Sequence, residues 1–175
     1  MFIFVPENIH ITMHIKFGII IICLWITDIC LAQQSDSDSL EQANDFTYTL
    51  ASGEQHTLYT LRSDMVLLYF YDPTCEDCHL LMSQLETSTI VNRLIDDKKL
   101  TILAVYPEND TETWNEYAEH IPQQWINGYD KEVKILMEEI YIINQFPTLY
   151  LLDKDKMIRM KEMTFQELEN ELDNI

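Results

Sequence analysis

The longest apolar run beyond residue 40 spans residues 65–71 and reads Met-Val-Leu-Leu-Tyr-Phe-Tyr. Because every position is apolar, rather than every second one, this run predicts a central strand covered on both faces of a sheet. Residues 100–106 predict a second buried strand of the same kind. Shorter segments predict a β-hairpin at residues 46–59 and two further strands at residues 149–152 and 157–160.

Apolar residues three and four positions apart predict helices between these strands. The expected helices cover residues 75–86, 90–95, 111–120, 131–141 and 164–172. Thr164 followed by Glu167 has the spacing of a capping box at the start of the last helix. Residues 125–130, with Asn127-Gly128, are expected to form a loop. Strands that alternate with helices and end in a hairpin and a helix predict an α/β sandwich on a mixed sheet.

The first 32 residues predict a leader rather than a part of this domain. Lys16 lies in a short basic region after Met13, an apolar stretch covers residues 17–26, and small residues precede Gln33. We therefore expect a signal peptide that starts at Met13 and is cut after residue 32, giving an exported, periplasmic protein. The apolar stretch is short for a membrane span, and an uncleaved, membrane-anchored form is the alternative.

The remaining chain divides into a polar segment and one acidic domain. Residues 33–44 are expected to be a flexible linker, and residues 45–175 form the domain. The chain has 30 Asp and Glu but 11 Lys and Arg, a net charge of −19, and the leader holds only three of these charged residues. So acidic a domain excludes nucleic acid and anionic lipid as expected partners, and we expect a monomer.

The cysteines point to chemistry rather than to structural cross-linking. Of the four cysteines, two belong to the leader, which leaves Cys75 and Cys78. A disulfide between them would close a very small ring and add little stability. The pair follows a strand and starts a helix, where unpaired N–H groups stabilise a thiolate. We expect Cys75 to be the nucleophile of thiol–disulfide exchange and Cys78 to be the resolving thiol.

These motifs resemble those of the thioredoxin superfamily, and within it the exported TlpA/ResA-like proteins. The resemblance rests on a hairpin at residues 45–59, the strand leading into Cys75-Glu76-Asp77-Cys78, Phe146-Pro147-Thr148 before a later strand, and the turn at residues 151–155. It implies a thioredoxin-like three-layer sandwich with a mixed central sheet, flanking helices and an N-terminal β-hairpin.

The resemblance also implies a function and a substrate-binding loop. The protein would be an exported thiol–disulfide oxidoreductase that acts on protein thiols and disulfides of the cell envelope and draws on an unidentified electron donor. Pro147 would be cis, which X–Pro bonds tolerate, and Phe146, Pro147 and Thr148 would bind the substrate. We expect no metal and no cofactor other than the redox-active disulfide Cys75–Cys78.

Three residues beside the cysteines are expected to tune the thiolate. Glu76 and Asp77 place negative charge near Cys75, which raises the pKa of a thiol and makes the couple more reducing. His79 would offset this effect when it is protonated. The same two acids are also favourable first-turn residues of any helix, so this interpretation remains open. The pattern favours a reductant.

The proton acceptor for the second thiol is missing from its usual places. Thioredoxins carry a buried acid six residues before the first cysteine, where this chain has Tyr69. TlpA/ResA-like proteins often carry a glutamate six residues after it, where this chain has Leu81. Tyr69, His79, Asp72 or a water molecule are the candidates, and the sequence does not choose among them.

Three other interpretations remain open. Cys75-Glu76-Asp77-Cys78-His79 matches the CxxCH motif of covalent c-type haem attachment. A peroxidase of the peroxiredoxin class is a weaker match, because its proline lies further from the cysteine. A redox-sensing or binding module would use the dithiol without turning over a substrate. Aromatic residues Trp114, Trp125 and Tyr129 are expected to lie in the core rather than to line a partner groove.

Overall fold

The computed structural model describes residues 41–175, so the expected leader and residues 33–40 of the expected linker lie outside the described residues. Residues 41–44 pack onto the domain, and for them the linker prediction is wrong. Gln42 forms a β-bridge with Met157, and the buried Ala43 donates its N–H to the Lys156 carbonyl at 2.8 Å. Backbone pairing outweighs the polar composition of this segment.

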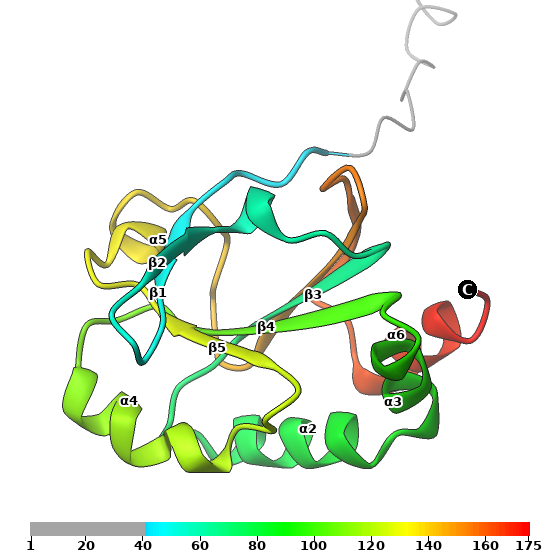
Figure 1. Ribbon diagram of the computed structural model, residues 1–175, viewed down its shortest axis with the longest axis horizontal. Coiled ribbons are helices and arrows are strands. Elements are labelled where there is room, and N and C mark those ends of the chain that lie inside the picture. The colour runs from blue at the N-terminus through cyan, green and yellow to red at the C-terminus, as the bar shows by residue number, and fades with distance from the viewer. Residues whose placement is uncertain (1–40) are drawn as a thin grey trace, which may run out of the picture. The chain divides into compact units, whose positions relative to one another are not determined.

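Seven strands form one mixed sheet in the order β2-β1-β5-β4-β3-β6-β7 (Figure 1). The strands are β1 (Thr47–Thr49), β2 (Gln55–Thr57), β3 (Met65–Phe70), β4 (Leu100–Tyr106), β5 (Ile126–Tyr129), β6 (Thr148–Asp153) and β7 (Ile158–Lys161). The helices are α2 (Glu76–Thr87), α3 (Thr89–Asp96), α4 (Thr111–Tyr117), α5 (Lys134–Met137) and α6 (Phe165–Leu172), with 3-10 turns η1 (Leu58–Thr60) and η2 (Ala118–His120). Within residues 41–175, none of these helices has the length and apolar character needed to cross a membrane.

Strand β3 lies at the centre of the sheet, as its apolar run predicts. It pairs in parallel with β4 and antiparallel with β6. Its side chains alternate between two cores, Met65, Leu67 and Tyr69 entering one and Val66, Leu68 and Phe70 entering the other. Burial of all six side chains explains why no polar position interrupts the run.

The two faces of the sheet are covered by layers of different thickness. Helices α2, α3, α4 and α6 lie on one face, while α5, η1 and the N-terminal segment lie on the other (Figure 1). The expected sandwich of a mixed sheet with flanking helices and an N-terminal hairpin is confirmed. The predicted capping box is also confirmed, because Thr164 and Glu167 exchange side-chain to backbone hydrogen bonds at the start of α6.

Strand β5 replaces the loop expected at residues 125–130, and that prediction is wrong. Leu103 to Tyr106 of β4 pair with the whole of β5, and Thr49 of β1 pairs with Tyr129 on the other side. The Asn-Gly pair suggested a turn, but Gly128 serves close packing instead. A Cβ atom at this position would lie 2.7 Å from Cδ2 of Tyr48.

Helix α5 is a single turn, so the prediction of a helix over residues 131–141 is wrong in length. The carboxylate of Asp130 accepts hydrogen bonds from the N–H groups of Glu132 and Ile135 and holds the segment before α5 in a turn. Val133 and Glu139 adopt left-handed conformations with φ of 56° and 49°, which interrupt a continuous helix. As a result Ile135 is buried, whereas Met137 is 79% exposed.

Candidate active site

The turn between β3 and α2 fixes the position of the two cysteines. The Asp72 carboxylate accepts hydrogen bonds from both the N–H and the hydroxyl of Thr74, each at 2.6 Å. The N–H of Cys75 donates to the Asp72 carbonyl at 3.1 Å. An aspartate that binds the backbone two residues ahead is typical of a tight turn. The turn places Cys75 at the N-cap of α2, as the sequence predicts.

Cys75 faces the edge of the site and is partly exposed. Its Sγ accepts a hydrogen bond from the N–H of Cys78 at 3.2 Å, in the manner of a helix N-cap. The same thiol donates to the Phe146 carbonyl at 3.5 Å. Since this sulfur has a helix N–H aimed at it and access to solvent, it is placed to act as a nucleophile.

Cys78 is enclosed by the core and has no exposed surface. Burial raises the pKa of its thiol well above the usual value, and its contact with Cys75 raises that pKa further. Both cysteines are free thiols in this structure. The first sulfur is thus accessible, and the second is buried and protonated.

The loop before β6 lies beside the dithiol, as the resemblance implied. The Phe146–Pro147 peptide bond is cis, which confirms that prediction. Because Phe70 at the end of β3 pairs with Thr148 at the start of β6, the loop and the cysteines meet at one edge of the sheet. The buried hydroxyl of Thr148 donates to the Gln145 carbonyl at 2.6 Å, so this side chain shapes the loop rather than facing outward.

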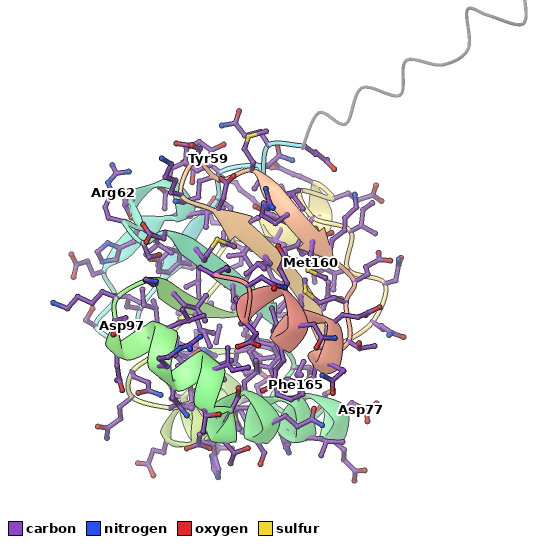
Figure 2. The ribbon with its side chains drawn as sticks, turned by 90° about the vertical axis from the view of Figure 1, so that its right-hand side faces the viewer. Tyr59, Arg62, Asp77, Asp97, Met160 and Phe165 are labelled. Carbon is purple, nitrogen blue, oxygen red and sulfur yellow. The ribbon has the colours of Figure 1, made fainter. Side chains whose placement is uncertain are left out.

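The three residues expected to tune the thiolate lie in or beside the first turn of α2. Glu76 and Asp77 are exposed, and Figure 2 shows Asp77 at the lower right of the molecule. His79 Nε2 lies 2.8 Å from the Pro73 carbonyl, to which it can only donate. This contact ties the helix to the turn that precedes the cysteines.

Tyr117 of α4 also belongs to this site, and sequence reasoning missed it. Its ring stacks on His79 with centroids 4.9 Å apart and on His120 at the same distance. Burial raises the pKa of Tyr117 to about 12, and the neighbouring Cys78 and Cys75 add to this shift. No local pattern indicates the contact, because it depends on how α4 packs against α2.

Tyr69 is excluded as the proton acceptor for Cys78. Its hydroxyl donates to the Cys78 carbonyl at 2.7 Å, and burial raises the pKa of the phenol far above its usual value. A phenol that is protonated and already committed as a donor cannot take up a proton at neutral pH. Leu81 is partly buried and packs against the core, so neither family position supplies a base here.

The aromatic residues near the dithiol are core residues, as predicted. Trp114, Trp125 and Tyr129 are all buried, between 1% and 9% exposed. The amide oxygen of Asn127 accepts hydrogen bonds from Trp114 Nε1 at 3.2 Å and from the Tyr71 hydroxyl at 2.9 Å. These aromatic side chains belong to the same buried cluster as Cys78.

The residues of the CxxCH motif do not fit covalent haem. Attachment needs both sulfurs at one open surface, but Cys78 is fully buried against the sheet. The Nε2 atom of His79, which would bind the iron, is engaged with Pro73. Among residues 41–175, no group of three or more His, Cys, Asp or Glu is arranged to hold a metal ion.

Comparisons with known proteins assign this arrangement to a family. A model of the thioredoxin-like family matches residues 63–158. The thioredoxin-like protein YneN of Bacillus subtilis is 30% identical over 141 residues, which cover 76% of this chain and 78% of that protein. The chain belongs to the thioredoxin-like family. It carries the two-cysteine motif, Cys75 and Cys78, typical of thiol–disulfide oxidoreductases.

Solved structures of thioredoxin-like proteins share this fold. A thioredoxin-like protein from Bacteroides caccae is 39% identical with a TM-score of 0.76, and the match covers 78% of this chain but only 50% of that one. The C-terminal domain of an uncharacterized protein from Bacteroides fragilis is 35% identical with a TM-score of 0.75, and the match covers 79% of this chain and 99% of that one. The chain thus spans half the length of the first structure and nearly all of the second.

Proposed function

We propose that this protein is an exported thiol–disulfide oxidoreductase that reduces disulfides of proteins in the cell envelope. The observation that carries the proposal is the placement of Cys75 at the helix N-cap, against the carbonyl that precedes cis-Pro147, with Cys78 buried behind it. This arrangement exposes one nucleophilic sulfur to a substrate and keeps the second sulfur buried.

The reaction passes two electrons from the dithiol to the substrate. The Cys75 thiolate attacks one sulfur of a substrate disulfide, forming a mixed disulfide, and the displaced thiolate takes a proton from water. Cys78 then loses its proton and attacks Cys75 Sγ, which releases the second substrate thiol. The products are two substrate thiols and the Cys75–Cys78 disulfide. An external dithiol donor would return the protein to its reduced form.

The negative charge of two residues beside Cys75 supports the reducing direction. Glu76 and Asp77 lie in the first turn of α2, directly after the N-cap Cys75. Acidic neighbours destabilise a thiolate and hence the reduced state, which lowers the reduction potential. The helix dipole acts in the opposite sense.

The equilibrium reduction potential of the full chain in thiol/disulfide buffers tests the direction. A value at or below about −230 mV, toward the thioredoxin end of known couples, is expected. A double variant, Glu76→Gln with Asp77→Asn, is expected to shift the potential upward. A wild-type value above about −150 mV would contradict a reductant and point to an oxidase or isomerase.

Turnover separates an enzyme from a redox-sensing module. With dithiothreitol as donor, the protein is expected to accelerate reduction of insulin disulfides, and Cys75→Ser is expected to abolish the effect. A reversible Cys75–Cys78 disulfide without any acceleration would favour the module instead.

Export is proposed from the leader at residues 13–32 alone. Cell fractionation and N-terminal sequencing of the protein made from the full chain test it. A periplasmic species that begins at Gln33 is expected. A cytoplasmic species that retains residues 13–32 would contradict export, and a membrane-bound species that retains them would indicate an anchor.

A further inference from the structure

The edge of the sheet that carries the dithiol is acidic in a way that the reaction itself does not require. The two connections that leave β3 and β4 at this edge, residues 71–79 and 107–112, hold six acidic residues and no Lys or Arg. We call these six the acidic collar. It consists of Asp72, Glu76, Asp77, Glu108, Asp110 and Glu112.

Strand pairing shows that the two halves of the collar are neighbours. Phe70 at the end of β3 pairs in parallel with Val105, so both strands deliver their connections to the same edge. The Tyr106 side chain lies where the two connections meet. Burial raises the pKa of its phenol, and the nearby charges of Glu108, Asp72 and Asp110 raise it further. Carboxylates from both connections therefore lie close enough to act on the same side chain, that of Tyr106.

Positive and negative charges are mixed at the opposite edge of the sheet. Met65 at the start of β3 pairs with Leu100 and with Asp153, so the segments that precede β3 and β4 and follow β6 meet there. These segments carry Arg62, Lys98, Lys99 and Lys154 alongside Asp64, Asp96, Asp97 and Asp155, so acids and bases offset one another. Figure 2 shows Arg62 and Asp97 on one flank of the molecule and Asp77 on the other.

The nearest lysines on the dithiol side do not neutralise the collar. Lys131 and Lys134 follow β5, one strand further from the cysteines. Lys134 forms an ion pair with Glu132 in its own loop. The carboxylates that act on Tyr106 are those of Glu108, Asp72 and Asp110, and Asp72 also acts on Cys78.

We infer that the acidic collar selects cationic clients, namely disulfides flanked by Lys or Arg, for the dithiol at its centre. The inference rests on the proposed function, because the reactive sulfur defines the site and the collar defines which surfaces approach it. A cleft or rim of one sign raises association rates of oppositely charged partners by about 10-fold to 10³-fold at low salt. Like-charged substrates are repelled by the same field.

Two sequence-matched peptide disulfides, one flanked by lysines and one by glutamates, test this inference. The full chain is reduced beforehand, so a single turnover needs no donor, and the second-order rate constant is measured by acid quench and thiol alkylation. At about 10 mM ionic strength, the lysine peptide is expected to react at least about 10-fold faster than the glutamate peptide. At about 0.5 M salt, where charges are screened within a few ångströms, the ratio is expected to fall below about threefold.

A matched pair of triple variants locates the effect. E108Q/D110N/E112Q removes three charges from the α4 half of the collar, and Asn is a good helix N-cap, so Asp110→Asn retains the start of α4. D64N/D96N/D97N removes three charges at the opposite edge. The rate ratio between the two peptides is expected to fall below about threefold in the first variant and to stay near wild type in the second. A partial loss of folded protein lowers the rates for both peptides equally, so the ratio between them does not change.

The outcomes separate this inference from the proposed function. Equal rates for both peptides, with reduction still lost in Cys75→Ser, would overturn the charge selection and leave the oxidoreductase standing. An equal loss of preference in both triple variants would also overturn it, because the effect would then belong to net charge. No Cys75-dependent reduction of either peptide would overturn both.

Discussion

At the scale of single residues, the contrast between the two cysteines governs the chemistry. The Cys78 thiol has a pKa raised by burial, so it stays protonated at neutral pH and becomes a better nucleophile as pH rises. The release of substrate from the mixed disulfide should therefore accelerate with pH, by about tenfold per unit below that pKa. Quenched-flow measurements of release between pH 6 and pH 9 check this expectation.

Cys78→Ser provides the control for that prediction. Without a resolving thiol, the mixed disulfide between Cys75 and the peptide should accumulate and be visible as a mass adduct under non-reducing conditions. Cys75→Ser should give no adduct. A release rate that does not change with pH would show that proton loss from Cys78 does not limit the step.

Tyr69 makes a separate residue-scale prediction, because it stabilises the site without taking part in proton transfer. Tyr69→Phe removes the hydrogen bond to the Cys78 carbonyl, and we expect a loss of about 1 kcal/mol in the free energy of unfolding. The exchange rate should stay within about threefold of wild type. Denaturant titration and single-turnover kinetics measure the two quantities.

Tyr71→Phe is a matched control. The Tyr71 ring stacks on Tyr69, but its hydroxyl donates to Asn127 rather than to the Cys78 carbonyl. Both variants should lose similar stability and retain activity. If Tyr69→Phe alone lowered the rate more than tenfold, the phenol would have a direct part in the reaction.

At the scale of secondary-structure elements, β5 depends on a glycine for close packing. A Cβ atom on residue 128 would overlap the Tyr48 ring at 2.7 Å, so Gly128→Ala should lower the free energy of unfolding by about 1–3 kcal/mol. In a Tyr48→Ala background the same change should cost at least about 1 kcal/mol less. Chemical denaturation of the four proteins of this cycle measures the coupling. Equal costs in both backgrounds would place the strain elsewhere.

The elements also show where local patterns are reliable. Strand β3 and helices α2, α3 and α6 follow the predicted ranges closely, because their apolar spacing and caps are properties of consecutive residues. Strand β5 and helix α5 do not follow them. The pairing of β5 comes from β4 and β1, and α5 is bounded by two left-handed residues, Val133 and Glu139.

At the scale of the whole molecule, a net charge of −19 repels itself in the compact state. Screening should therefore stabilise the fold. Raising NaCl from about 10 mM to about 0.3 M is expected to add about 1 kcal/mol, which corresponds to about 3 °C in Tm for a chain of this size. Thermal unfolding followed by circular dichroism checks it. A Tm that falls or stays constant would mean that local ion pairs compensate the repulsion.

Residue order alone predicts the central strand, the cysteine pair at a helix start and the capping box. These three features depend on residue types at short, fixed spacing, whereas the cis-proline was implied by the family resemblance. The sequence also predicted the mixed sheet and the family, because alternating strands and helices leave few ways to bury their apolar faces. The sequence left the proton acceptor open.

Strand order and helix packing determine which distant residues meet. Cys75 contacts Phe146, His79 stacks on Tyr117, and Tyr69 is committed to the Cys78 carbonyl. The acidic collar also depends on tertiary structure, because the parallel pairing of β3 with β4 brings two acidic connections to the dithiol edge. Such contacts join residues separated by up to 71 positions and depend on strand order and helix packing, which no local pattern encodes.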